Sequence, residues 1–345
     1  MKRLKAIDLF SGCGGLSLGL RQGGFRIIGA VEVDPLAVKT YKANHKGVKV
    51  WETDIRKLPA KRVMKALKLR PGQLDLLAGC PPCQGFSTMT TLNGKLGSED
   101  PRNDLVFQFV RFVRVMKPKS IMMENVPGLA KDGRIDEVCA TFRKLGYECE
   151  VRVLNAADYG VPQRRRRMIL LAGRAGQIPF ARKGHLKRTV WDAFRKLGKR
   201  ARRADELHNL PESRSASVEA LIRSIPKNGG SRIDLGTETQ LECHRRCDGF
   251  KDVYGRMRWK DVSPTITGGC CNPSKGRFLH PVANRTISLR EAALLQSFPP
   301  SYRFSLDRGK FAVAQMIGNA LPPEFIKRHA NKVARYLRKN TGSVT

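Results

Sequence analysis

Acidic residues and long apolar runs are both scarce in this chain of 345 residues, which has 30 Asp and Glu against 65 Lys and Arg and a formal net charge of +35. No apolar stretch approaches the roughly 18 residues that a membrane-spanning helix needs. The opening residues 1–3 lead directly into an apolar strand, which leaves no room for a signal peptide. We therefore expect a cytoplasmic protein with no membrane partner. The positive charge suits a nucleic-acid partner, although a ribosome-associated protein or a chain kept soluble by self-repulsion would share it.

A disulfide framework is not expected, and internal repeats are missing. The nine cysteines are odd in number, which argues against a disulfide framework. Cys243, His244, Cys247, Cys270 and Cys271 do not form the two clean pairs of a zinc site, so we expect no metal. Without repeats or low-complexity tracts, the length fits one full catalytic domain and a second, smaller one.

One cysteine stands where chemistry is expected. Residues 79–87 read GCPPCQGFS and follow the apolar run 74–78, which places Cys83 just past a predicted strand end. Open α/β sheets bind their ligands at that edge, and the two prolines before Cys83 stiffen the turn. Taken alone, the segment fits a nucleophilic Cys83, a tight turn with buried thiols, or a redox pair of Cys80 and Cys83.

A glycine-rich turn lies near the start of the chain. Residues 7–16, IDLFSGCGGL, predict a strand that runs into a turn and then a helix, with Gly12 and Gly14 allowing a ligand to approach the backbone. Glu32 closes the next apolar strand, residues 26–33, where a carboxylate would accept hydrogen bonds from ribose hydroxyls. The glycines lack the G-x-G-x-x-G spacing, which favours a mononucleoside-type cofactor over a dinucleotide. The turn also fits a packing device.

Four further blocks follow in order. Residues 120–129, SIMMENVPGL, predict an apolar strand that ends in Glu124, and residues 159–167, YGVPQRRRR, precede the apolar strand 168–172. Because alternate residues of a strand share a face, Arg165 and Arg167 should point to one side of the strand. Arg164 and Arg166 should point to the other side. The last two blocks are REAALLQSFP at 290–299 and QMIGNALPP at 315–323.

In this order the six blocks resemble the motifs of the DNA (cytosine-5)-methyltransferase family, from Ile7 through Pro323. The resemblance is to the bacterial stand-alone type of restriction-modification systems. It implies a Rossmann-like α/β methyltransferase fold with a smaller, β-rich target-recognition domain, S-adenosylmethionine as cofactor, and double-stranded DNA as partner of a monomeric enzyme. Since the helical periodicity weakens after about residue 180, we expect domains at 1–180 and 181–307, with 308–345 returning to the first.

The resemblance also assigns the chemistry. Cys83 attacks carbon 6 of a flipped-out cytosine, while protonated Glu124 hydrogen-bonds ring nitrogen 3 and the exocyclic amine, so that carbon 5 can accept a methyl group. Arg165 is expected beside the ring oxygen and the nucleophile. Gln163, Arg165 and Arg167 together match a family pattern of a glutamine with arginines two and four places after it. Thr265 is expected to meet the backbone of the extruded nucleotide. Cys80 is then structural.

The cofactor residues follow in the same way. The resemblance places the methionine part of the donor against the glycine turn, the ribose on Glu32 and the adenine beside the segment after the third strand. The implied set is Phe10, Gly12, Gly14, Leu16, Glu32, Asp54, Ile55, Pro81, Leu105 and Asn319.

Three further expectations concern segments of the chain. The loop 84–104 is the natural lid over the base. The basic stretch 195–203 is either a solvated helix face or a phosphate contact. Helices are predicted at 105–116 and 135–145, and a final helix at about 325–337 should pack beside the glycine turn.

Two other functions stay open at this point. An RNA-directed, tRNA-methylating branch shares the catalytic motifs, although the long basic segment 180–286 argues against it. A catalytically inactive DNA-binding protein is disfavoured by intact Cys83, Glu124 and Arg165. No motif encodes the recognised bases, because specificity depends on side-chain geometry in the groove.

Overall fold

The computed structural model describes residues 3–82, 105–184, 187–236 and 252–340. The chain forms two compact units: unit 1 contains residues 1–159, 166–183 and 321–345, and unit 2 contains 160–165 and 184–320. This division differs from the predicted one at two points. Residues 160–165 group with unit 2, and the return to unit 1 begins at Leu321 rather than at residue 308.

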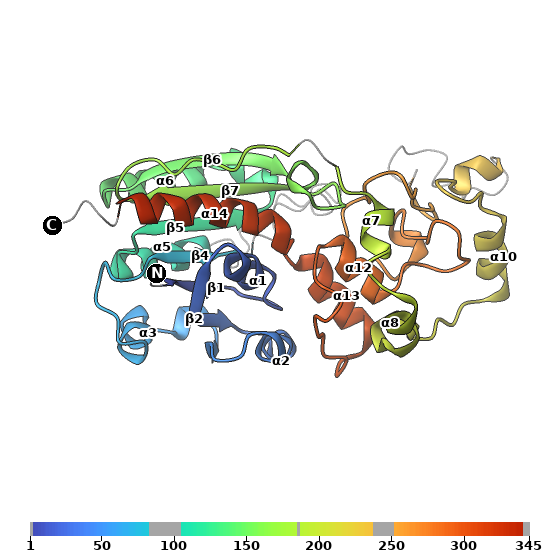
Figure 1. Cartoon of the computed structure of the whole chain (residues 1–345), viewed down its shortest axis with the longest axis horizontal. Helices are drawn as coiled ribbons and strands as arrows, with labels where there is room; N and C mark the ends of the chain where they lie inside the picture. Colours follow the sequence, from blue (N-terminus) through green and yellow to red (C-terminus); the bar gives the residue numbers. More distant parts are fainter. Residues whose placement is uncertain (1–2, 83–104, 185–186, 237–251, 341–345) are drawn as a thin grey trace. The chain divides into compact units, whose positions relative to one another are not determined.

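Unit 1 is built on a seven-stranded sheet in the order β3-β2-β1-β4-β5-β7-β6 (Figure 1). All pairs from β3 to β5 are parallel, and β7 lies antiparallel between β5 and β6. The central strands are almost wholly buried, which explains their continuous apolar sequences. The predicted α/β fold is confirmed. The strands are β1 (Leu4–Leu9), β2 (Phe25–Glu32), β3 (Lys49–Glu52), β4 (Leu76–Gly79), β5 (Ser120–Asn125), β6 (Glu148–Asn155) and β7 (Arg166–Gly173).

Helices cover this sheet. Residues of α3, α5 and α6 join Ile7 and Leu9 of β1 in one apolar cluster, while Asp8 between them reaches Ser17 of α1. Successive residues of β1 therefore face different helices. The predicted helix at 105–116 is confirmed as α5. The elements are α1 (Gly15–Gln22), α2 (Pro35–Asn44), η1 (Ile55–Lys57), α3 (Ala60–Ala66), α5 (Leu105–Met116), η4 (Pro127–Lys131), α6 (Gly133–Lys144), η5 (Ala156–Tyr159) and α14 (Pro323–Asn340).

The last helix returns to pack on α1, as predicted. Figure 1 shows α14 in red beside α1. The approach is so close that a Cβ on Gly19 would lie 2.6 Å from the Ile326 Cβ, and one on Gly23 would lie 2.4 Å from the Ala330 Cβ. The absence of a side chain at these two positions lets the C-terminal helix pack closely on α1.

The strand order reverses between β1 and β4. From β1 the chain winds outward to β2 and β3, and then crosses to β4 and β5 on the other side. Leu9 pairs with Gly79 at the carboxyl ends of the two strands, and the Cys80 amide donates to the Leu9 carbonyl at 3.3 Å. Ligands of open α/β sheets bind at such a switch point, so this edge is where unit 1 should hold a ligand.

Unit 2 consists of short helices and irregular segments. Within its described residues the extended segments pair only through isolated bridges, so the expected β-rich character is not found there. Glycines 268, 269 and 276 and Pro273 interrupt the backbone ladders. The elements are α7 (Val190–Phe194), α8 (Lys199–Ala204), α9 (Glu206–Asn209), α10 (Ala216–Ser224), η6 (Arg232–Leu235), η9 (Pro273–Lys275), α12 (Leu289–Leu295) and α13 (Gly309–Asn319).

A buried arginine holds part of unit 2 together. Arg256 is fully buried beside a small apolar cluster, and burial lowers the pKa of its guanidinium. All five of its N–H groups have acceptors, which compensates the cost of burying the charge. The acceptors are the carbonyls of Ile222, Ile225, His280 and Ala283 and the Asn284 Oδ1, at 2.6 to 3.1 Å.

Candidate active site

The glycine turn after β1 is shaped by a carboxylate. Phe10 and Gly12 have φ of 59° and 52°, a left-handed conformation that favours glycine at position 12. The Gly12 amide donates to Glu32 Oε2 at 2.7 Å, and Glu32 Oε1 accepts from the amides of Val33 and Asp34, each at 2.9 Å. Glu32 therefore joins the ends of β1 and β2. Three of its roughly four acceptor positions are used, which leaves capacity for one hydroxyl.

The same turn has open space above it. A Cβ on Gly12 would meet no atom within 4 Å, so crowding does not explain the glycine. Gly14, with φ of 95°, caps α1, and Leu16 is buried within that helix. The turn thus leaves open space at Gly12 beside the start of α1, an arrangement that suits a ligand group.

The residues expected near the adenine already have partners within the protein. Asp54 accepts from the Arg56 amide at 2.9 Å and pairs with its guanidinium at 2.5 Å. The hydrogen bonds from Arg56 lower the pKa of Asp54. Ile55 and Leu105 both belong to the apolar cluster of unit 1, with exposures of 3% and 9%. Their side chains fill the core, so only their backbone or edges remain for a ligand.

The end of β5 holds the segment that precedes Cys83. Asn125 is buried, and its Nδ2 donates to the Pro81 carbonyl at 2.9 Å while its Oδ1 accepts from the Val126 amide at 2.8 Å. Pro81 is buried as well. Sequence reasoning assigned no role to Asn125, because its partner lies 44 residues away. Two prolines and this amide fix the chain before the predicted nucleophile.

Glu124 is a buried carboxyl with a cationic partner. It is 8% exposed, and Arg167 Nε on β7 lies 2.9 Å from its Oε1. Arg167 comes into reach because β7 runs antiparallel beside β5. Burial alternates along the arginine run as predicted: Arg165 is buried and Arg167 partly so, while their neighbours Arg164 and Arg166 are exposed.

Cys80 shares the neighbourhood of Glu124. Burial raises the pKa of its thiol well above the usual range, and the adjacent Glu124 carboxyl, which is within hydrogen-bonding reach, raises it further. Such a thiol stays protonated at neutral pH and reacts poorly with disulfides. This environment argues against the redox-pair interpretation and fits a structural Cys80.

In unit 2, the segment 163–165 is held against 263–266. The Arg164 amide donates to the Ser263 carbonyl at 2.9 Å, and the Thr265 hydroxyl donates to the Arg164 carbonyl at 2.6 Å. Buried Gln163 accepts from the Ile266 amide at 2.9 Å, and its Nε2 donates to Gln296 Oε1 at 2.9 Å. The predicted residues Gln163 and Thr265 are thus brought together.

Arg165 is fixed by the same unit. It is 2% exposed, and its two terminal nitrogens donate to the carbonyls of Ile266 and Gly318, at 3.0 and 2.9 Å. Asn319 follows as the last residue of α13, exposed to solvent, and its Oδ1 accepts from Gln315 Nε2 at 3.1 Å.

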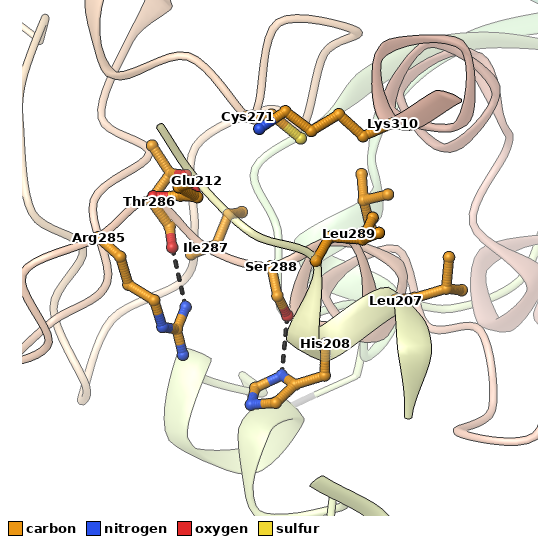
Figure 2. A pocket seen from close by; sticks show the side chains of 11 residues that line it. Leu207, His208, Glu212, Cys271, Arg285, Thr286, Ile287, Ser288, Leu289 and Lys310 are labelled. Carbon is orange, nitrogen blue, oxygen red and sulfur yellow. Dashed lines mark hydrogen bonds between the residues drawn. The ribbon is translucent and has the colours of Figure 1, made fainter. Parts of the chain in front are cut away.

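A small pocket in unit 2 is separate from these residues. Figure 2 shows His208 hydrogen-bonded to Ser288 and Arg285 to the Thr286 carbonyl. Arg285 also pairs with Glu291 of α12 at 2.7 Å. None of the predicted site residues lines it; the lining consists of Leu207, His208, Leu210, Glu212, Cys271, Arg285, Thr286, Ile287, Ser288, Leu289 and Lys310.

Some predictions fall outside the described residues. These are the nucleophile Cys83, the lid 84–104, and three of the five residues weighed as zinc ligands, namely Cys243, His244 and Cys247. In the basic stretch, Arg202 donates to the carbonyls of Phe194 and Leu197. In the described parts of the chain, no group of three or more metal-binding side chains is found, and no helix is long and apolar enough to span a membrane.

The geometry defines an α/β unit with a ligand-binding edge at the β1/β4 switch point and a buried carboxyl at the end of β5. A family model of C-5 cytosine-specific DNA methylases matches residues 4–335. The chain belongs to this family, and it is an enzyme that methylates carbon 5 of cytosine in DNA. The predicted resemblance is confirmed, and the family requires a methyl donor.

Individual relatives agree with the assignment. The Type II methylase M.HgiDII of Herpetosiphon aurantiacus is 35% identical, over 96% of this chain and 95% of its own length. The Type II methyltransferase M1.HphI of Haemophilus parahaemolyticus is 36% identical, over 98% of this chain and 88% of its own. The crystal structure of a DNA modification methyltransferase encoded within an E. coli prophage has a TM-score of 0.70 at 24% identity, covering 98% of this chain and 100% of that one. This last similarity concerns the fold.

Proposed function

We propose that the methyl donor is S-adenosylmethionine, that the substrate is a specific sequence in duplex DNA, and that Cys83, Glu124 and Arg165 carry the chemistry. The observation that carries this proposal is buried Glu124 paired with Arg167, next to a Pro81 segment that Asn125 holds in place. A monomer suffices, because one flipped-out base is handled at a time.

The residues of unit 1 fit this donor. The turn at Gly12 offers open space and backbone groups to the methionine part, and Glu32 keeps an acceptor position for a ribose hydroxyl. Asp54 serves the adenine through its carboxylate edge, in competition with Arg56. When bound, the donor supplies an electrophilic methyl group on a positively charged sulfur.

The protein's own residues activate the base. The Cys83 thiolate adds to carbon 6, because carbon 5 is a poor nucleophile until the ring loses its aromaticity. Glu124, held by Arg167, accepts a hydrogen bond from the exocyclic amine and faces ring nitrogen 3, where charge develops as the ring is attacked. After methylation of carbon 5, loss of the carbon 5 proton and of Cys83 restores the aromatic ring. Arg165 is held rigid by two carbonyls, so it can face the base at little entropic cost.

The experiment is expression of the full chain in a host that lacks cytosine methylation, followed by bisulfite sequencing of its DNA and RNA. We expect methylated cytosines within one consistent DNA motif. A Cys83→Ala variant should give fully converted DNA while still binding S-adenosylmethionine. Methylated RNA with unmethylated DNA would transfer the proposal to an RNA substrate, and a methylating Cys83→Ala variant would remove Cys83 from the mechanism.

A further inference from the structure

A buried carboxyl lies directly beneath the glycine turn. Asp8, on β1, is 0% exposed, and its Oδ2 accepts from the Ser17 hydroxyl of α1 at 2.7 Å. The Ser17 oxygen is also 2.7 Å from the Tyr41 hydroxyl of α2. The other carboxyl oxygen, Oδ1, has no hydrogen-bond partner. Asp8 and Ser17 thus link β1 to helices α1 and α2 beside the glycine turn. One of the two oxygens of the Asp8 carboxyl still lacks a hydrogen-bond donor.

Among the described residues, the groups whose electrostatic interactions involve Asp8 are an acid, two thiols and the Tyr41 hydroxyl. The charge of Glu32, at the end of β2, raises the pKa of Asp8. The charge of Asp8 in turn raises the pKa of the thiols of Cys13, in the turn, and Cys80, after β4. No Lys or Arg of the described residues is among the groups that act on the Asp8 carboxyl. Two cations of the described residues act on its neighbours: Arg21 of α1 lowers the pKa of Tyr41 and of His45, which stacks on the Tyr41 ring, and Arg167 lowers that of Cys80.

Asp8 is the member of this network that titrates near neutrality. Burial raises its pKa to about 7, against the lowering effect of the Ser17 hydrogen bond, and the charge of Glu32 adds to the rise. Burial raises the pKa of Cys13 to about 12, and that of Tyr41 above its usual range, so both stay neutral. Burial lowers the pKa of His45 to about 4, so this imidazole is neutral as well.

We propose that Asp8 is a positioning residue through which the enzyme distinguishes the charged methyl donor from its neutral-sulfur product, and that donor binding releases the Asp8 proton to solvent. This inference rests on the proposed use of S-adenosylmethionine. A sulfonium and an ammonium placed at the turn favour the ionised carboxylate in a low-dielectric site, so Asp8 gives up its proton as the donor arrives. S-adenosylhomocysteine lacks the sulfonium charge, so it should displace less of the proton and leave more readily.

The test is calorimetric titration of the full chain with S-adenosylmethionine, in buffers of high and low ionisation enthalpy. Working from about pH 5.5 to pH 7 keeps the α-amino group of the donor protonated. We expect proton release on binding, and a donor affinity that rises with pH across this range by up to about tenfold per unit. S-adenosylhomocysteine, titrated in parallel, should show a smaller release and a flatter profile.

Variants separate this role from a structural one. Asp8→Asn should abolish the proton release, flatten the profile and reduce the preference for donor over product. Ser17→Ala removes the hydrogen bond that lowers the Asp8 pKa, so it should move the rise in affinity to higher pH. Asp136→Asn, an exposed acid of α6, is the matched control and should leave all three quantities unchanged.

The outcomes distinguish this inference from the proposed function. Donor binding with no proton release and no pH dependence in the wild-type chain would overturn the role of Asp8 and leave the cofactor assignment standing. The same holds if folded Asp8→Asn keeps the wild-type profile, with Ser17→Ala also unshifted. If S-adenosylmethionine does not bind at any pH, the cofactor proposal itself fails.

Discussion

Arg167 Nε lies 2.9 Å from Glu124 Oε1, across the antiparallel pair of β7 and β5. The two side chains come from positions 43 residues apart, and both are largely shielded from water. A pair in such a site is costly to break from one side, because the remaining charge stays buried and unpaired. The relationship makes Arg167 a support for Glu124, the acid proposed to contact the base.

Replacing either member should therefore reduce methylation. For Glu124→Gln we expect a loss of about 10²- to 10⁴-fold in the rate of methyl transfer, the range for a positioned acid, with donor affinity unchanged. Arg167→Gln should lower the rate in the same direction. Single-turnover transfer of labelled methyl to DNA measures both. Arg166→Gln, an exposed neighbour, is the control, and a Glu124→Gln enzyme at the wild-type rate would contradict the assignment.

Asn125→Ala should slow transfer by loosening the Pro81 segment. The substitution removes a buried hydrogen bond of 2.9 Å and leaves the Pro81 carbonyl without its donor, a cost of about 1–3 kcal/mol in stability. We expect the rate of transfer to fall more than this loss of stability accounts for. Thermal melting and single-turnover rates, measured together, test this. A stability loss with an unchanged rate would make Asn125 purely structural.

Gly12→Ala and Gly72→Ala form a matched pair. Both glycines have positive φ, of 52° and 83°, and neither would place a Cβ within 4 Å of another atom. Each substitution should cost about 1 kcal/mol of stability through backbone strain alone. Only Gly12→Ala should also weaken S-adenosylmethionine binding, which calorimetry or equilibrium dialysis measures. Equal donor affinities in the two variants would count against the turn as the cofactor site.

Asp8 makes stability depend on pH in an unusual direction. Its pKa is about 7 in the folded chain against an ordinary 3.8, so between these values the folded state binds a proton that the unfolded state does not. Stability from this group is therefore present at acid pH and decreases as pH rises toward 7, by at most about 4 kcal/mol. Relative to wild type, Asp8→Asn should melt at progressively higher temperature from about pH 5 to pH 8. An unchanged difference in melting temperature across that range would contradict the buried-acid assignment.

Arg256→Met should destabilise unit 2. Five acceptors would lose their donor in a buried site, and we expect a loss of more than about 3 kcal/mol. Hydrogen exchange of residues 216–236 and 252–287 reports the effect locally. Arg258→Met, two residues on and exposed, should leave exchange unaltered. Similar exchange in both variants would show that the Arg256 hydrogen bonds contribute little.

The sequence placed several of the proposed site residues at strand ends, where the structure also has them. Phe10, Glu32, Pro81 and Glu124 follow or end apolar strands, and parallel strands bring their carboxyl ends to one edge of a sheet. The prediction for Asp54 was incomplete, although its partner Arg56 stands only two residues away and an Asp two residues before an Arg is a local capping pattern. Ile55 and Leu105 turned out to be core residues, a distinction that motif position cannot make.

Other residues could not be found from the sequence. The hydrogen-bond partner of Asn125 lies 44 residues away, and the partners of Arg256 lie up to 34 residues away. The neighbouring sequence therefore does not predict either buried hydrogen-bond network. The second unit was expected to be β-rich because of the family resemblance, and its weak helical periodicity marked where it begins. Its described residues form short helices and single bridges, since frequent glycine and proline prevent long ladders.

The sequence by itself determined the order of strands and helices and the family, and it supplied the proposal for the reacting residues, because apolar periodicity, turn residues and motif order are properties of neighbouring positions. The tertiary structure decided which carboxyls have partners. Glu124 meets Arg167, Glu32 meets three backbone amides, and Asp8 keeps one oxygen without a partner. Burial and Coulomb interactions depend on segments that are distant along the chain, so the proton affinity of a group is settled only when the fold brings those segments together.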